Sequence, residues 1–300
     1  MQQLTGVHVY EKRKDDPWTK LGLAVQLLSI LSWKTRYGRI ELYTNGAHLE
    51  DLRAHGLDKL YDKIDTTTLA SVEVDTKKWW AFGKIQIAAT LTPPFVILDT
   101  DLWITDFLTF SETDSYQAYH REIIFNDPNG NNYIINYDPL LPKEWINRWN
   151  SEVLPTNTAF LRINDSGFAK EWYNCSHRIA TLPNPPEIEE NLAHSAYMTF
   201  IEQRLLPMLA TELDKPYSTM VEPIYRSCSS FGNGDEWQPN ANDWSDDMKA
   251  EFSKIIHIWG LKSQLGDPEI KDLVFTVIQN SFALYPEAQA FTNLLDYWRS

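Results

Sequence analysis

Residues 94–104 read PFVILDTDLWI, an uninterrupted apolar run followed by Asp99 and Asp101. A run without polar breaks predicts a strand buried on both faces, as in a parallel sheet covered by helices. Side chains two apart on a strand point to the same side. A continued strand would therefore place both carboxylates at the carboxyl edge of the sheet, roughly 6 to 7 Å apart.

The two carboxylates imply a binding partner of opposite charge. At an effective dielectric constant of 20 the pair repels by roughly 2.5 kcal/mol. A divalent cation would convert this repulsion into affinity, because paired carboxylates on rigid backbone commonly hold Mg²⁺ or Mn²⁺. The alternative is a pair of solvated aspartates in a turn. A calcium-binding EF-hand loop is excluded, since the further ligands and the glycine that it requires are absent.

The chain before this motif alternates between strands and helices. Strands are predicted at residues 6–10, 39–43 and 61–65, and helices at residues 16–36, 47–55 and 79–90, with Gly38 and Gly56 ending the first two helices. This β-α-β order predicts right-handed crossovers onto a parallel sheet. Because no glycine-rich loop follows the first strand, both a dinucleotide fingerprint and a P-loop are excluded.

The chain after the motif has shorter strands and more polar turns. Strands are predicted at residues 116–120, 133–137, 158–163 and 254–259. Helices are predicted at residues 168–180, 191–213, 267–282 and 288–298, the second interrupted near Pro207. Residues 181–190 and 227–247 are expected to be long loops that could act as lids. Without an obvious linker, residues 1–300 are expected to form one α/β domain, with a nucleotide-binding half at 1–104 and an acceptor half at 105–300.

Composition limits the class of partner. The net charge of −14 argues against nucleic acid or an anionic membrane as the main partner, because both are bound through dense lysine and arginine. No transmembrane segment or secretory leader is recognised. With only two cysteines in 300 residues, the sequence predicts a cytoplasmic protein.

Further polar residues could contribute to a site. His257 lies in the apolar segment IIHIWGLK, where a packed core histidine is the alternative to a metal ligand. Lys262 is a candidate for contact with phosphate, and Lys84 for contact with phosphate or sugar, although Lys84 could equally be a solvated helix lysine. Asn157 begins an apolar strand and Glu202-Gln203 lie in a predicted amphipathic helix; taken singly, these three are more typical of solvated or capping residues.

Together these residues resemble the metal-dependent glycosyltransferases of the GT-A fold, most closely the retaining family 8 and the related family 32. Asp99-Thr100-Asp101 matches the DxD motif, and Lys84 resembles the basic residue of the preceding helix. His257, Gly260 and Lys262 resemble the late His-x-x-Gly-x-Lys motif, although the lysine comes one residue earlier than in the commonest family 8 spacing.

Other positions complete the resemblance. The strand that begins at Asn157 resembles part of the sugar site, and Glu202-Gln203 resembles the acidic-Gln element near the reacting centre. Val7, His8 and Tyr10 occupy the place where the family binds the nucleotide. The fold expected from this resemblance is a GT-A-like, Rossmann-type mixed sheet, mostly parallel and flanked by helices.

The resemblance implies a hexosyltransferase-like enzyme of polysaccharide biosynthesis. It would move a sugar, with retention, from a nucleoside diphosphate sugar to a glycan, a lipid-linked glycan or another hydroxyl acceptor, with UDP as the expected nucleotide. The implied ligands of Mn²⁺ or Mg²⁺ are Asp99, Asp101 and His257.

Two alternatives stay open. One is a catalytically silent protein that binds a sugar nucleotide or a glycan. The other is a phosphatase of the haloacid dehalogenase type, which would use Asp99 as its nucleophile. Its motif normally stands on the first strand with Thr or Val where this chain has Trp103.

Overall fold

The computed structural model describes residues 4–12, 19–71, 73–76, 78–122, 141–150, 152–182, 199–221, 254–257, 268–292 and 295. The strand expected at 133–137 and the loop expected at 227–247 lie outside this part of the chain, as does the helix start expected at residue 16. The loop expected at 181–190 is described only at its first two residues, 181 and 182.

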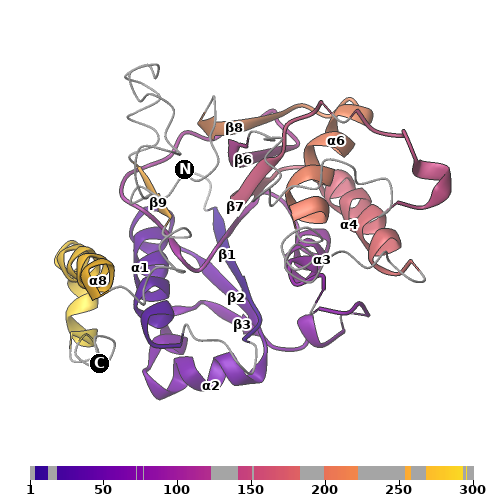
Figure 1. The fold of residues 1–300 in the computed structure, drawn as a ribbon. Helices are drawn as coiled ribbons and strands as arrows, with labels where there is room; N and C mark the ends of the chain where they lie inside the picture. Colours follow the sequence, from indigo (N-terminus) through magenta and orange to yellow (C-terminus); the bar gives the residue numbers. More distant parts are fainter. Residues whose placement is uncertain are drawn as a thin grey trace. The chain divides into compact units, whose positions relative to one another are not determined.

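The chain folds into two compact units, and both are discontinuous in sequence. The first contains Met1–Thr66, Leu98–Thr109 and Tyr225–Ser300, and the second contains Thr67–Ile97 and Phe110–Ile224. The fold is α/β, with a mixed, mostly parallel sheet flanked by helices, as the sequence predicts (Figure 1). The expected division at residue 104 stays a prediction.

The first unit contains three parallel strands in the order β3-β2-β1. They are β1 (Thr5–Tyr10), β2 (Ile40–Thr44) and β3 (Lys63–Asp65), and their crossovers are α1 (Thr19–Tyr37) and α2 (Gly46–Ala54). The parallel β-α-β order predicted for this region is confirmed. Gly38 and Gly56 follow the two helices with positive φ angles of 92° and 73°, which only glycine adopts without strain.

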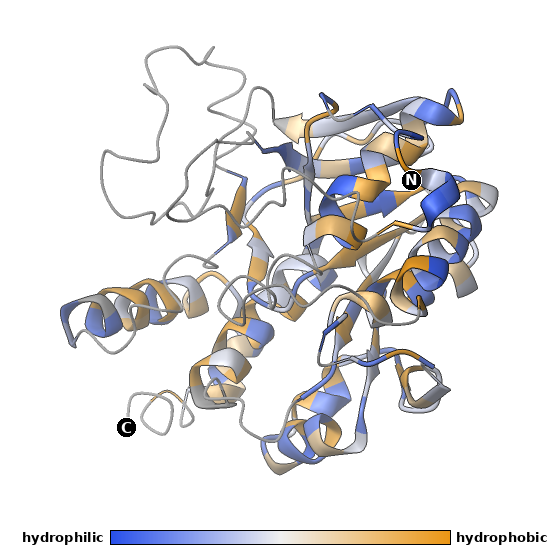
Figure 2. Ribbon diagram, turned by 45° about the vertical axis from the view of Figure 1, so that its right-hand side comes forward, coloured by the Kyte–Doolittle hydropathy of each residue, from blue (hydrophilic) through white to orange (hydrophobic). Residues whose placement is uncertain are grey.

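Two further strands of this unit form a separate antiparallel pair. They are β5 (Leu102–Ile104) and β9 (Ile255–His257). After β9 come helix α8 (Pro268–Phe282) and a 3₁₀ segment, η8 (Pro286–Phe291). The start and end expected for α8 are confirmed, whereas residues 286–291 form a 3₁₀ segment where the sequence predicts an α-helix from 288. Hydrophobic and hydrophilic residues alternate along α8, as expected of a helix with one exposed face (Figure 2).

Helix α1 is buried over most of its length. Every residue from 23 to 33 is buried, and the indole of Trp33 lies against Gly6 of β1. A helix that is buried on all sides must pair its polar side chains internally. The buried run contains Gln26, Ser29 and Ser32, so each of these needs a partner.

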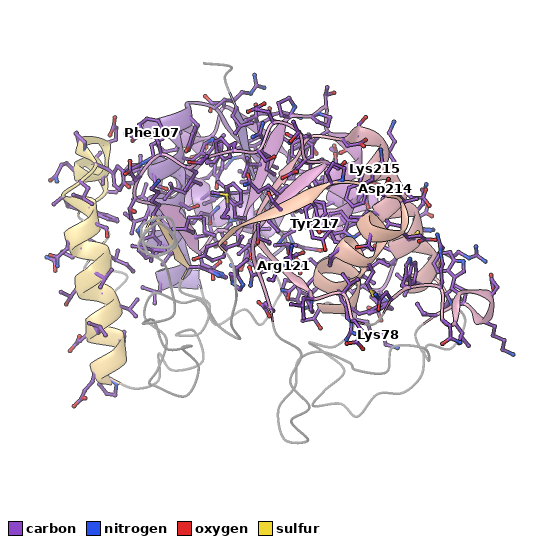
Figure 3. All side chains as sticks on the ribbon, turned by 90° about the horizontal axis from the view of Figure 1, so that it is seen from above. Lys78, Phe107, Arg121, Asp214, Lys215 and Tyr217 are labelled. Carbon is purple, nitrogen blue, oxygen red and sulfur yellow. The ribbon has the colours of Figure 1, made fainter. Side chains whose placement is uncertain are left out.

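The second unit contains four strands in the order β4-β7-β6-β8. They are β4 (Phe95–Leu98), β6 (Tyr116–Arg121), β7 (Thr156–Ile163) and β8 (Tyr217–Val221). Strands β6 and β7 are antiparallel, and β6 and β8 are parallel. The sequence analysis missed β8. Its Tyr217 lies beside Arg121 of β6, with the guanidinium 5.7 Å from the ring centre (Figure 3).

The helices of the second unit are α3 (Phe82–Thr90), α4 (Ser166–Ala180) and α6 (Leu205–Glu212). A π-helical turn, Phe200–Arg204, leads directly into α6. The interruption expected near Pro207 is present as this π-helical turn, which ends three residues before the proline, whereas Pro207 itself lies inside α6. Proline cannot donate to the carbonyl of the residue four positions earlier, which is consistent with an irregular turn there.

Short 3₁₀ segments connect these elements. They are η1 (Leu57–Leu60), η2 (Leu69–Ser71) and η4 (Lys143–Trp145). Within the described ranges, no helix has both the length and the apolar character of a membrane span.

The contact between β1 and α1 gives a first prediction. A Cβ atom at Gly6 would lie 2.5 Å from Nε1 of Trp33, whose N–H donates to Arg39 O at 2.8 Å and fixes the indole. We therefore expect Gly6→Ala to lower the free energy of unfolding by about 1–3 kcal/mol, the usual effect of overpacking. Urea denaturation measures this change.

Gly46 is the matched control for Gly6, because a Cβ atom there meets nothing within 4 Å. It is the first residue of α2, so Gly46→Ala should leave stability unchanged or raise it by a few tenths of a kcal/mol. Equal effects of the two substitutions would show that the Gly6–Trp33 contact is not tight.

Candidate metal centre

The two aspartates lie in a turn that redirects the chain. Strand β4 ends at Leu98, and Leu102 N donates to Asp99 O at 3.1 Å. The expectation that one strand continues through both aspartates, with carboxylates 6 to 7 Å apart, is therefore wrong. The physical reason is that β5, which begins at Leu102, pairs with β9 in a different sheet.

The pairing of β5 with β9 brings His257 to the aspartates. Leu102 pairs with His257, so the histidine lies beside the end of the turn. Potential ligand atoms of Asp99, Asp101 and His257 all lie within 4.8 Å of one another. His257 Nε2 is 3.6 Å from Asp101 Oδ1, and both side chains are buried, whereas Asp99 is half-buried.

The geometry and the chemistry of these three groups fit a divalent cation. Carboxylate oxygens are hard ligands, and a neutral imidazole nitrogen is a common ligand of transition metals. Two ligands of one ion at distances of about 2.0–2.3 Å lie at most about 4.0–4.6 Å apart, so atoms within 4.8 Å of one another need only small side-chain shifts to share an ion. Asp99 remains partly exposed, which leaves the site open on one side for another ligand.

His8 is part of a buried hydrogen-bond network in the same unit. Its Nδ1 lies 2.7 Å from Tyr61 Oη, and its Nε2 lies 2.9 Å from Ser29 Oγ. Gln26 Nε2 donates to Tyr61 Oη at 2.7 Å, which directs the tyrosine proton to His8 Nδ1. We therefore assign the proton of the neutral imidazole to Nε2, which donates to Ser29.

The environment keeps His8 neutral. Complete burial, together with the nearby His48, lowers the pKa of His8 to about 3, although Asp101 acts in the opposite direction. A histidine that stays neutral at pH 7 contributes hydrogen bonds but no positive charge near Asp101.

The three residues expected to bind the nucleotide differ in accessibility. Val7 and His8 have 0% exposed surface. Tyr10, at the end of β1, is half-buried, and its ring lies 4.4 Å from that of His48. Of the three, only Tyr10 therefore has surface that a nucleotide could contact in this structure.

In the second unit, Lys84 and Glu202 form a buried ion pair. Lys84 Nζ lies 2.5 Å from Glu202 Oε1, with side-chain exposures of 7% and 3%. Thr158 Oγ1 donates to the same carboxylate oxygen at 2.6 Å, and Lys84 Nζ also donates to Thr158 O at 3.3 Å. Glu202 lies in the π-helical turn, a feature often found at functional sites. The sequence analysis named Lys84 and Glu202 separately but did not pair them and missed Thr158.

The remaining predicted residues are distributed as follows. Asn157 Nδ2 donates to Glu122 Oε1 at 2.8 Å, and its Oδ1 accepts from Ala159 N at 3.0 Å. Gln203 follows Glu202 and is half-buried. Gly260 and Lys262 lie outside the described residues. The structure thus brings Asp99, Asp101 and His257 together in one unit and Lys84 and Glu202 together in the other.

A family model described as "Family of unknown function (DUF6734)" matches residues 18–260, which include all three candidate metal ligands. The chain belongs to this family. No curated protein matches it at a significant level.

Solved structures show distant similarity to this chain. The apo form of mouse xyloside xylosyltransferase 1 has a TM-score of 0.42 and 12% identity, over 85% of this chain and 96% of that one. The glycosyltransferase GlyE of Streptococcus pneumoniae TIGR4 has a TM-score of 0.37 and 13% identity, over 72% of this chain and 45% of its own. At these TM-scores the similarity carries no conclusion about function.

The low pKa of His8 gives a second prediction. Between pH 6.5 and about 3 the unfolded chain binds a proton at His8 that the folded chain does not. The free energy of unfolding therefore falls as the pH is lowered through this window. The His8 contribution should lower it by about 2 kcal/mol from pH 7 to pH 5. Urea denaturation of wild type and His8→Gln at both pH values measures it; equal pH dependence of the two proteins would contradict a buried, neutral His8.

The ion pair of the second unit gives a third prediction. Removing one partner leaves a buried charge without its counter-charge, so Lys84→Met should lower the free energy of unfolding by about 3–5 kcal/mol. The double variant Lys84→Met/Glu202→Gln should recover part of this loss, because no unbalanced charge remains. Denaturant titration of the single and double variants measures the coupling.

The control for this cycle is the surface pair of Glu144 and Arg178, whose side chains are 58% and 52% exposed. Glu144→Gln should change the free energy of unfolding by less than about 1 kcal/mol, since exposed ion pairs contribute little. Additive effects of the Lys84 and Glu202 substitutions would show that the buried pair is not energetically coupled.

Proposed function

We propose that this protein is a metal-dependent glycosyltransferase, which transfers a sugar from a nucleoside diphosphate sugar to a hydroxyl acceptor. The observation that carries the proposal is the cluster of Asp99, Asp101 and His257, whose ligand atoms lie within 4.8 Å of one another. Two carboxylates and an imidazole in one place are unfavourable unless they hold a cation or share protons.

The donor set favours Mn²⁺ over Mg²⁺. Magnesium prefers oxygen ligands alone, whereas a mixed carboxylate and imidazole set suits manganese. A cation bound here would act as a Lewis acid on the diphosphate leaving group of the donor. The protein's own contribution is to hold His257 on β9 and Asp101 directly before the paired strand β5, so that little reorganisation accompanies binding.

Other residues complete the proposed site. Tyr10 has exposed surface that could contact the nucleotide of the donor. The nucleotide expected here is UDP. Lys84 and Lys262 are proposed to bind phosphate or sugar oxygens of the donor. Gly260, in the same late motif as Lys262, is proposed to lie at the donor site. Lys84 would then have to divide its hydrogen bonds between the donor and Glu202.

The proposed reaction proceeds with retention of configuration. The bond between the anomeric carbon and the phosphate oxygen breaks, and the acceptor hydroxyl oxygen bonds to that carbon on the same face. The hydroxyl proton passes to the departing phosphate oxygen, so no separate strong base is required. Asn157, Glu202 and Gln203 are proposed to orient the sugar, and the acceptor is proposed to be a glycan or a lipid-linked glycan. Nothing in the described residues favours the phosphatase alternative.

Release of nucleoside diphosphate tests this function and gives the fourth prediction. Wild type should release UDP or GDP from one member of a donor panel in the presence of Mn²⁺, and EDTA should stop the release. Asp101→Ala removes a metal ligand, so the rate should fall at least about 100-fold.

Asp106→Asn is the matched control, because Asp106 is an exposed aspartate just after β5 and lies outside the cluster. It should retain the wild-type rate. Full activity of Asp101→Ala would overturn the proposal. Donor binding by wild type without release would favour the catalytically silent module instead.

A further inference from the structure

Helix α1 presents a row of polar side chains inside the first unit. Gln26, Ser29 and Ser32 lie at intervals of three within the buried run 23–33, and Arg36 continues the row near the end of the helix. Residues at this spacing share one face of a helix. Gln26 and Ser29 belong to the His8 network described above. Ser32 contacts strand β5, and Arg36 contacts Thr105 just after that strand.

Ser32 binds the backbone of β5. Its Oγ accepts from Ile104 N at 3.0 Å and donates to Ser29 O at 2.9 Å. Successive N–H groups of a strand point in opposite directions. The next one, from Thr105, donates to Lys254 O at 2.8 Å beside β9. The Ile104 N–H therefore points away from β9, and Ser32 is its acceptor.

Arg36 contacts the residue that follows β5. Its guanidinium donates to Thr105 O and, at 3.0 Å, to Ser32 O. Tyr285, directly before η8, has its hydroxyl 3.4 Å from Ile104 O and 3.5 Å from Arg36 Nη1. Ser32 and Tyr285 thus bind the edge of β5 opposite β9, and Arg36 holds the chain where the strand ends.

The position of β5 affects the distance between two of the candidate metal ligands. Asp101 directly precedes β5, and Leu102 of β5 pairs with His257. A shift of β5 along or away from α1 would therefore move Asp101 relative to His257. Metal ligands tolerate displacements of only about 0.2 Å, so anchoring of this strand bears directly on affinity. A three-residue strand paired on one side is too short to fix itself to that tolerance.

We propose that Ser32 and Arg36 are positioning residues of the Asp99–Asp101–His257 centre, which they hold in register for the metal by anchoring β5 to α1. This role rests on the proposed metal site. Neither residue touches the ligand atoms in the contacts described above, so their effect would pass through the backbone of Ile104 and Thr105.

The test is Mn²⁺ binding to the full chain, measured by electron paramagnetic resonance of free Mn²⁺, together with hydrogen exchange of the metal-free protein. Ser32→Ala should raise the Mn²⁺ dissociation constant about tenfold, the effect typical of residues that orient metal ligands. It should also speed amide exchange in residues 102–104. Ser32→Thr, which keeps the hydroxyl, should restore both values.

Ser176→Ala is the matched control, since it removes a fully buried helical hydroxyl from α4 in the second unit. It should leave Mn²⁺ affinity unchanged. If Ser32→Ala fails to fold, Arg36→Met removes the second anchor from a half-buried position and should weaken Mn²⁺ binding severalfold.

The outcomes separate the two proposals. Unchanged Mn²⁺ affinity in a folded Ser32→Ala or Arg36→Met chain, beside a wild type that binds Mn²⁺, overturns the positioning role alone. A stability loss in Ser32→Ala without any change in Mn²⁺ affinity does the same, because it indicates only a structural hydroxyl. A wild-type chain that binds no Mn²⁺ overturns the metal centre itself, and the positioning role with it.

Discussion

The pairing of Leu102 with His257 is the constraint on which the candidate site depends. Among the residues that the structure describes, it is the strand pairing that joins the DxD turn to the late histidine, and it involves two strands of three residues each. So short a pair is marginal by itself. The geometry of the pair must therefore be supported by neighbouring elements. Ile104 and Thr105 have such support through their hydrogen bonds to side chains of α1 and to Tyr285. The geometry of the two aspartates and His257 thus depends in part on side chains of helix α1.

The charge of a buried carboxylate is compensated differently in the two units. Glu202 has the ammonium of Lys84 at 2.5 Å and a threonine hydroxyl at 2.6 Å, so its charge is compensated by the protein. Asp101 lies 3.6 Å from His257, an imidazole that is cationic only when protonated. Burial holds the nearby His8 neutral, so it adds hydrogen bonds and no charge. Glu202 is thus neutralised by a lysine of the protein, whereas the environment of Asp101 suits an added cation.

Local signals predicted most of the first unit. Alternating apolar runs, with Gly38 and Gly56 as helix ends, specify β1 to β3 and their crossovers, because these features are encoded within a few residues. The turn at Asp99 was not predictable in the same way. An apolar run on both sides of it looks like one strand, and only the pairing of β5 with a distant segment divides it. The three candidate ligands were proposed from residue type, order and the family resemblance, but their mutual distance was not predicted. The partners of His8 and Lys84 are likewise set by tertiary contacts, although polar residues at intervals of three in an apolar helix were a visible signal for Gln26, Ser29 and Ser32.

The first unit is assembled from three separate segments of sequence, and the last of these supplies His257. Contacts between distant parts of a chain form late in folding, because closing the large loop between them costs entropy before any contact energy is gained. During synthesis the two aspartates would emerge well before the strand that completes their set. The nascent chain would accordingly pass through a stage in which Asp99 and Asp101 form only a weak, two-carboxylate site. The proposed three-ligand site would therefore be complete only after residue 257 has been synthesised and β9 has paired with β5.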